Sequence, residues 1–167
     1  YYPWSPVTTG DPTVVPDDPG PGMIPNVVTP ISNNTDHDVS LLVSLADDFG
    51  WVLTPPQTVT LPANDGQVLF WDILVDPGAV AGTLDPFVVT ITGEGDPVVA
   101  HGRVAVGGKL SARLASSTVL GAGLSNQVDV LVENRTGGLL HVTDIHLTDG
   151  LGWSIVSQTP VMDLASD

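Results

Sequence analysis

The chain has 167 residues, of which 42% are hydrophobic, so it can form one large domain or two small ones with true cores. Its 19 acidic residues against 4 basic ones give a formal net charge of −15, which excludes nucleic acid as a partner because phosphate binding needs clusters of Lys and Arg. No apolar run reaches the length of about 18 residues that a membrane helix needs, so we expect no membrane insertion. The chain has no cysteine, which favours a prokaryotic source for a protein of this kind.

Residues 1–25 predict an extended N-terminal arm. Seven of these residues are Pro, which is incompatible with a regular central strand over most of the segment. The segment also holds three of the nine aromatic residues of the chain, Tyr1, Tyr2 and Trp4. A solvated linker does not need aromatic side chains, so we expect the arm to dock onto another surface.

From Asn26 the sequence predicts an all-β fold. Short runs rich in β-branched and aromatic residues alternate with turn signals such as "NNTD", "ANDG" and "GEGDP". In "QVLFWDILV" the alternate residues Leu69, Trp71, Ile73 and Val75 share one face, which we place in the core. Seven short strands within about 80 residues are typical of an immunoglobulin-like (Ig-like) β-sandwich. The predicted strands are 27–32, 39–45, 51–54, 58–62, 67–75, 87–92 and 98–106.

A second set of strands follows "GG" at 107–108 and repeats the first. "NVVTPISNNT" (26–35) aligns with "QVDVLVENRT" (127–136), and "VSLADDFGW" (43–51) aligns with "IHLTDGLGW" (145–153). The second set of strands is predicted at 109–115, 128–133, 141–147 and 153–157. The domain division is therefore an arm at 1–25, sandwich 1 at 26–108 and a partial sandwich 2 at 109–167. Sandwich 2 ends at the position equivalent to Asp65, so the fold class is tandem Ig-like sandwiches with the second one incomplete.

The segment "GWVLTPPQTVTLPANDG…VDPGAVAGTLDPFVVTITG" (50–93) resembles the small Ig-like module that is appended to alpha-galactosidases and other secreted bacterial proteins. The matching features are Gly50-Trp51, Leu61-Pro62, the turn 64–66 and the loop 77–82. The resemblance implies a β-sandwich that serves as a spacer, stalk or assembly part. It implies no shared active site.

The sequence predicts no enzyme and no cofactor. It contains no nucleophile-elbow, zinc-protease or aspartic-protease motif. His141 and His146 are five residues apart on one predicted strand, so they point to opposite faces and cannot share a metal. Asn34, Asp36 and Asp38 alternate like the start of a calcium loop, but the Gly and Glu of that loop are missing, so an acidic turn is the favoured reading.

Two further sets of residues occupy equivalent places in the two copies. "NNT" and "NRT" are N-glycosylation sequons at Asn33 and Asn134, each at the start of a turn from which a glycan could project, although Asn-x-Thr can also be kept as a turn motif. Trp51 and Trp153 both follow a Gly and are expected to pack at the edge of each sandwich, with a sugar platform as the alternative.

The incomplete repeat leads to the functional hypothesis. Half a sandwich exposes an apolar face and unpaired strand edges. Three explanations are open: the chain is a fragment that lacks the remaining strands, a second copy of the chain supplies them, or the second set is a half that packs against sandwich 1. We therefore expect a non-catalytic extracellular subunit of a surface filament, assembled head to tail as a homopolymer through the arm and the open second sandwich. The alternative is an accessory or spacer Ig-like pair of a larger secreted glycoside hydrolase or adhesin. The arm residues expected to make the contact are Tyr1, Tyr2, Trp4, Val7, Val14 and Val15.

Overall fold

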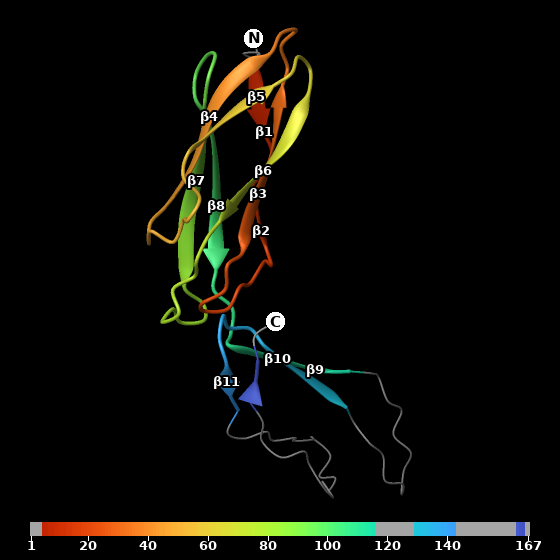
Figure 1. The fold of residues 1–167 in the computed structure, drawn as a ribbon, viewed down its shortest axis with the longest axis vertical. Helices are drawn as coiled ribbons and strands as arrows, with labels where there is room; N and C mark the ends of the chain where they lie inside the picture. The colour runs from red at the N-terminus through yellow and green to blue at the C-terminus, as the bar shows by residue number, and fades with distance from the viewer. Residues whose placement is uncertain (1–4, 116–128, 143–162, 166–167) are drawn as a thin grey trace, which may run out of the picture.

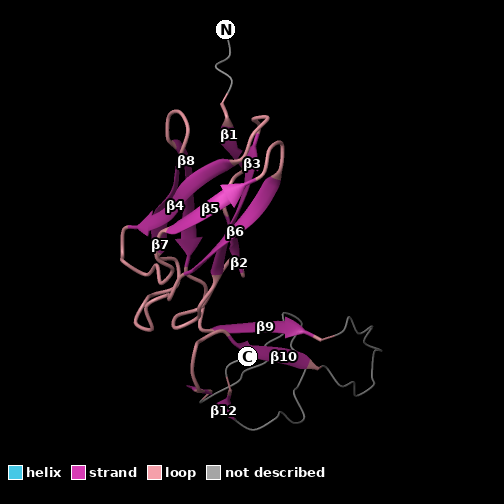
Figure 2. Ribbon diagram, turned by 45° about the horizontal axis from the view of Figure 1, so that its top comes forward, coloured by secondary structure: helices cyan, strands magenta, loops and turns pink. Residues whose placement is uncertain are grey.

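The computed structural model describes residues 5–115, 129–142 and 163–165. The described chain is all-β, with strands and no helix, as the composition predicted. Two four-stranded sheets form a β-sandwich in the N-terminal part, and a smaller group of short strands follows it (Figures 1 and 2). Tyr1, Tyr2, Trp4 and Trp153, along with the predicted strand 153–157, lie outside the described residues.

The first sheet is centred on β3 (Asn26–Asn33). Strand β6 (Gly66–Asp72) pairs with one edge of β3, while β1 (Val7–Thr9) and β2 (Thr13–Val15) pair with the other edge. All these pairings are antiparallel. The expectation of an extended arm therefore needs correction, because residues 7–15 form the outer strand of the first sandwich.

Pro30 explains why this outer strand is divided in two. The carbonyl of Pro30 accepts a hydrogen bond from Gly10 N at 3.0 Å, so the backbone of Pro30 faces the outer strand, where its ring leaves no N–H to return the bond. The register also shifts by one residue across the break, from Thr9 opposite Ile31 to Thr13 opposite Val28. A Cβ on Gly10 would lie 2.7 Å from the Pro30 ring, so glycine is required there.

The second sheet has the order β5-β4-β7-β8 and packs face to face against the first (Figure 1). Its strands are β4 (Val39–Asp47), β5 (Gln57–Leu61), β7 (Leu84–Thr92) and β8 (Val98–Ala105). The predicted strand 51–54 is reduced to one isolated bridge between Val52 and Ile73. Residues 51–53 nevertheless run along the sheet, since Leu74 N donates to Trp51 O and Leu53 N donates to Asp72 O.

The core lies between the two sheets and is built from alternate residues of each strand. The predicted inward face of 67–75 is confirmed, because Leu69, Trp71, Ile73 and Val75 are all buried. Trp71 and Phe87 are the largest fully buried side chains. Val7 is also part of this core, with 3% exposure, so the outer strand contributes to the stability of sandwich 1.

The second unit repeats the beginning of the first at the level of strand pairing. Strand β9 (Leu110–Leu114) pairs with β10 (Val130–Asn134) as β1 pairs with β3. Strand β11 (Leu140–His141) pairs with β12 (Asp163–Leu164) as β4 pairs with β5. Several large apolar side chains of this unit are exposed, namely Leu110, Val130, Leu131 and Leu139.

Candidate functional site at the joint between the two units

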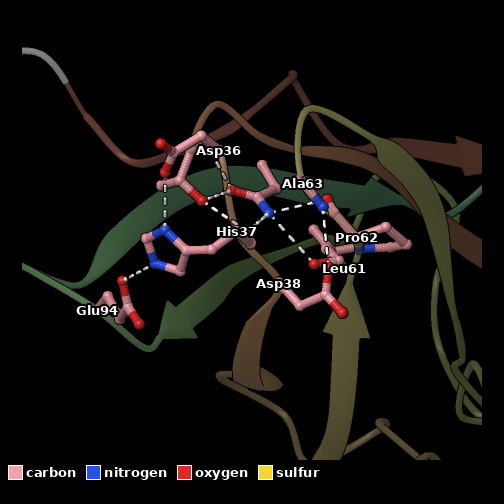
Figure 3. Close-up of polar contacts among 9 residues, drawn as sticks. Asp36, His37, Asp38, Leu61, Pro62, Ala63 and Glu94 are labelled. Atoms are coloured by element: carbon pink, nitrogen blue, oxygen red, sulfur yellow. Dashed lines mark hydrogen bonds and ion pairs between the residues drawn. The ribbon is translucent and has the colours of Figure 1, made fainter.

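The two predicted sequons form buried hydrogen-bond clamps. Asn33 is only 2% exposed, and its Nδ2 donates to the carbonyls of His37 and Pro62 at 2.8 Å and to that of Leu61 at 3.2 Å. Its Oδ1 accepts from the N–H and the hydroxyl of Thr35. Figure 3 shows these acceptors around the turn that links β3 to β4. The clamp therefore ties the end of β3 to the end of β5.

Asn134 makes the same clamp in the second unit. It is 7% exposed, its Nδ2 donates to Gly138 O at 2.7 Å and to Leu164 O at 2.8 Å, and its Oδ1 accepts from Thr136. Both amides point inward and their nitrogens are engaged, so of the two explanations of Asn-x-Thr this geometry fits the turn motif. The Asn-x-Thr pattern has a structural explanation in both copies.

The side chains of the acidic turn that resembles the start of a calcium loop do not converge on a common point. Asn34 donates to Ser5 O and Thr8 Oγ1, Asp38 accepts from Ala63 N, and Asp36 contacts His37. His37 Nε2 also lies 2.9 Å from Glu94 on the β7–β8 hairpin (Figure 3). The hydrogen bonds that His37 donates to Glu94 and then to Asp36 raise the pKa of His37, and the bond to His37 lowers the pKa of Asp36.

No group of three or more His, Asp or Glu side chains in residues 5–115, 129–142 and 163–165 is arranged to hold a metal ion. Over the same residues no helix has the length and hydropathy to cross a membrane.

The turn at Asn134–Gly138 also forms the joint between the two units. The Arg135 guanidinium forms a two-pronged contact, the Arg–Asp fork, with Asp18 in the loop that follows β2. Its Nη1 donates to Asp18 Oδ2 at 2.6 Å. Its Nη2 donates to Asp18 Oδ1 and, at 2.7 Å, to the main-chain oxygen of Asp18. This fork lowers the pKa of the Asp18 carboxyl and raises that of Arg135. A planar, two-pronged contact of this kind fixes orientation as well as distance.

At the joint, main-chain atoms of the two units approach each other more closely than Cβ atoms would allow. Gly107 N donates to Pro19 O at 2.9 Å, and Gly137 N donates to Pro21 O at 3.2 Å. A Cβ on Gly137 would lie 2.0 Å from Gly22 O, and one on Gly20 would lie 1.4 Å from Arg135 O. The "DDPGPG" loop and the "NRTGG" turn thus meet main chain to main chain, which sequence reasoning missed because the residues are more than 100 positions apart.

The remaining aromatic candidate, Trp51, is partly buried against sandwich 1. Its ring centroid lies 5.2 Å from that of Phe49, and it contacts the core cluster. Phe49 is 54% exposed. A shallow depression lies beside this pair, lined by Phe49, Trp51, Asp76, Gly78, Ala79 and Thr83.

Val14 and Val15 of the predicted assembly arm lie on opposite faces of β2. Val14 is half-buried against the core of its own sandwich, whereas Val15 is 56% exposed on the outward face of β2. Residues 7–15 thus pair within their own chain, and of the three valines predicted to make the assembly contact only Val15 is exposed.

No protein-family model and no curated protein matches the chain. Among solved structures, Salmonella alpha-2-macroglobulin matches with a TM-score of 0.50 and 20% identity over 66% of this chain and 8% of that one. The exo-chitosanase CsxA of Amycolatopsis orientalis matches with a TM-score of 0.49 and 16% identity, over 76% of this chain and 15% of that one. The FixG-related protein of Vibrio parahaemolyticus has a TM-score of 0.48 and 11% identity, over 62% and 98% respectively.

The antiparallel sheets define the class of fold, a β-sandwich, and the alpha-2-macroglobulin match, of Ig-like β-sandwich type, agrees with it. At this identity the alpha-2-macroglobulin match shows the fold alone, and the chain spans 8% of that protein's length. The resemblance to the module appended to alpha-galactosidases stays a prediction in its finer part, since no family model tests it.

Proposed function

We propose that the chain is a non-catalytic extracellular spacer, a tandem Ig-like segment that holds neighbouring parts of a larger protein at a fixed distance and angle. The observation that carries this proposal is the joint, where a charged fork and close backbone contacts connect the two units. A flexible linker would need none of these contacts.

This proposal follows the alternative hypothesis from the sequence, an accessory or spacer Ig-like pair, rather than the filament hypothesis. The filament hypothesis relied on the arm engaging the second sandwich of another copy, and in the structure residues 7–15 pair with β3 of their own sandwich. The turn 33–37 of sandwich 1, which is equivalent to the joint turn 134–138, has Asn34 in place of Arg135. The Asn34 side chain donates to Ser5 O and Thr8 Oγ1 within sandwich 1, so this turn has no counterpart of the Arg–Asp fork.

A distance measurement tests the spacer function. The chain has no cysteine, so spin labels can be attached specifically at Ser40→Cys on β4 and Ala112→Cys on β9, both of which are exposed. We expect one narrow distance distribution by double electron–electron resonance. Arg135→Ala should broaden it, because the loss of the fork frees the joint.

Arg113→Ala is the matched control, since Arg113 pairs with Glu133 within the second unit at 3.7 Å and does not touch the joint. It removes the same charge and should leave the distribution unchanged. A broad distribution in the parent chain would contradict the spacer function.

A further inference from the structure

The two sheets have four outer edges, and three of them carry features that oppose pairing with another chain. The β1/β2 edge is broken at Gly10 and contains Pro12 and Pro16, and it lies beside β8. Strand β8 carries His101 and Arg103, both exposed. Strand β5 has only five residues and lies between prolines, with Pro55-Pro56 before it and Pro62 after it.

The fourth edge, that of β6, has no such protection. Strand β6 pairs with β3 on one side, and no described strand pairs with the other side. Its residues between Gly66 and Trp71 include neither a charge nor a proline. Residues 51–54 cover only the end of this edge, where Asp72 N donates to Thr54 Oγ1 and Asp72 O accepts from Leu53 N.

Those two contacts at Asp72 show which backbone groups face the open side. The N–H and C=O of one residue point to the same side of a strand, and the direction alternates along the strand. Since Asp72 points away from β3, Val68 and Phe70 also point away from it. Their N–H and C=O groups are therefore available to an added strand, whereas Gly66 N is already bonded to Asp65 Oδ1.

The side chains of the same two residues form an apolar strip on the outer face. Val68 is 44% exposed and Phe70 is 57% exposed. Opposite them on β3 lie Pro30 and Val28, which extend the apolar surface across the sheet. An added strand would thus gain both backbone hydrogen bonds and apolar cross-strand contacts.

We propose that the open edge of β6 pairs antiparallel with β6 of a second copy of this chain, about a two-fold axis at Val68. The edge is self-complementary in that register. Val68 exchanges hydrogen bonds with the Val68 of the second copy, and the N–H of Phe70 reaches the carbonyl of Gly66. Phe70 then lies over Gly66, a pairing in which an aromatic ring covers the backbone that glycine leaves bare.

This register also keeps the second copy clear of the covered end of β6. A centre at Val68 uses residues 66–70, so the second copy does not meet residues 53–54 beside Asp72. The formal charge of −15 on each copy opposes association, and salt screens that repulsion. The pairing is therefore weak at low ionic strength and stronger at high ionic strength.

Sedimentation velocity over about 10 μM to 1 mM protein, at about 0.05 M and 0.5 M NaCl, tests the pairing. We expect the sedimentation coefficient of the parent chain to rise with concentration, and more steeply at high salt. Val68→Lys should abolish the rise, since it places like charges opposite each other. Leu42→Lys is the matched control, because Leu42 is 51% exposed on β4, which is paired on both sides.

Amide exchange identifies the contact within the associated state. The amides of Val68 and Phe70 should gain protection as concentration rises, while other exposed amides do not. A parent chain that stays monomeric under all these conditions overturns the proposal. So does association that survives Val68→Lys or that Leu42→Lys reduces equally. A monomer in which an added extended peptide protects the two amides would show that the edge takes a foreign strand, and self-pairing would be rejected.

Discussion

Replacement of Asp85 by asparagine should stabilise sandwich 1 at neutral pH. Asp85 lies on β7 with 0% exposure, next to Asp47 at the end of β4. Its Oδ1 accepts a hydrogen bond from Asp48 N at 3.2 Å, but its buried Oδ2 has no donor among the described residues. Burial and then the contact with Asp47 raise the pKa of Asp85 from 3.8 to about 6. Below that pKa the protonated acid is favoured, because burial and the neighbouring Asp47 disfavour the charged carboxylate.

The size of the effect follows from this pKa. A carboxyl whose pKa is higher in the folded state stabilises the fold below its unfolded pKa and loses that contribution as pH rises through its folded pKa. A rise from 3.8 to about 6 corresponds to roughly 3 kcal/mol, lost between about pH 4 and pH 6. An asparagine amide can donate to Asp47 as the protonated acid does, and it does not ionise.

Urea unfolding followed by tryptophan fluorescence at pH 4, 5, 6 and 7.5 measures this effect. We expect Asp85→Asn to match the parent chain near pH 4 and to exceed its free energy of unfolding by up to about 3 kcal/mol at pH 7.5. Asp11→Asn, at an exposed position, is the control for the lost charge. A difference between Asp85→Asn and the parent that does not vary with pH, or a variant less stable at pH 7.5, would refute the reasoning.

Two further predictions concern the clamp turn. Asn33→Ala should lower the free energy of unfolding by about 2–4 kcal/mol, because it leaves buried carbonyls and Thr35 without partners. Asn34→Ala, the control, should lower it much less, and chemical denaturation measures both variants. The pKa of His37, raised mainly by Glu94, should fall toward its ordinary value in Glu94→Gln when followed by NMR titration. In the parent chain the His37 contact is complete at low pH and is lost as pH rises through this raised pKa. An unchanged His37 titration in the variant would show that Glu94 is not the cause.

The alternation of apolar residues was sufficient to predict the core. The face of 67–75 and the buried faces of β3, β4 and β7 follow a period of two that burial between sheets imposes. The divided outer strand was missed because the proline density argued against a regular central strand there, and an edge strand was not considered. The repeat could have predicted it, because a strand was predicted at 109–115, before the segment that matches 26–35. In the structure the two preceding segments are equivalent, since Asn34 N bonds to Pro6 O as Arg135 N bonds to Lys109 O.

The candidate site was less predictable than the core. The sequons were recognised as matching turns, but nothing local shows that Asn33 reaches Pro62, 29 positions away. The joint depends on Arg135 meeting Asp18 across 117 positions. The Asp47–Asp85 pair likewise forms only when β4 and β7 align. Such contacts depend on the register between distant strands, which no pattern within one segment specifies.

Residual dipolar couplings, measured for backbone amides of both units in one alignment medium, test the spacer function most directly. A fixed joint predicts that sandwich 1 and the strands β9 and β10 report the same alignment magnitude and axes. A clearly smaller magnitude for β9 and β10 would mean that the second unit moves independently, and it would contradict the proposed function.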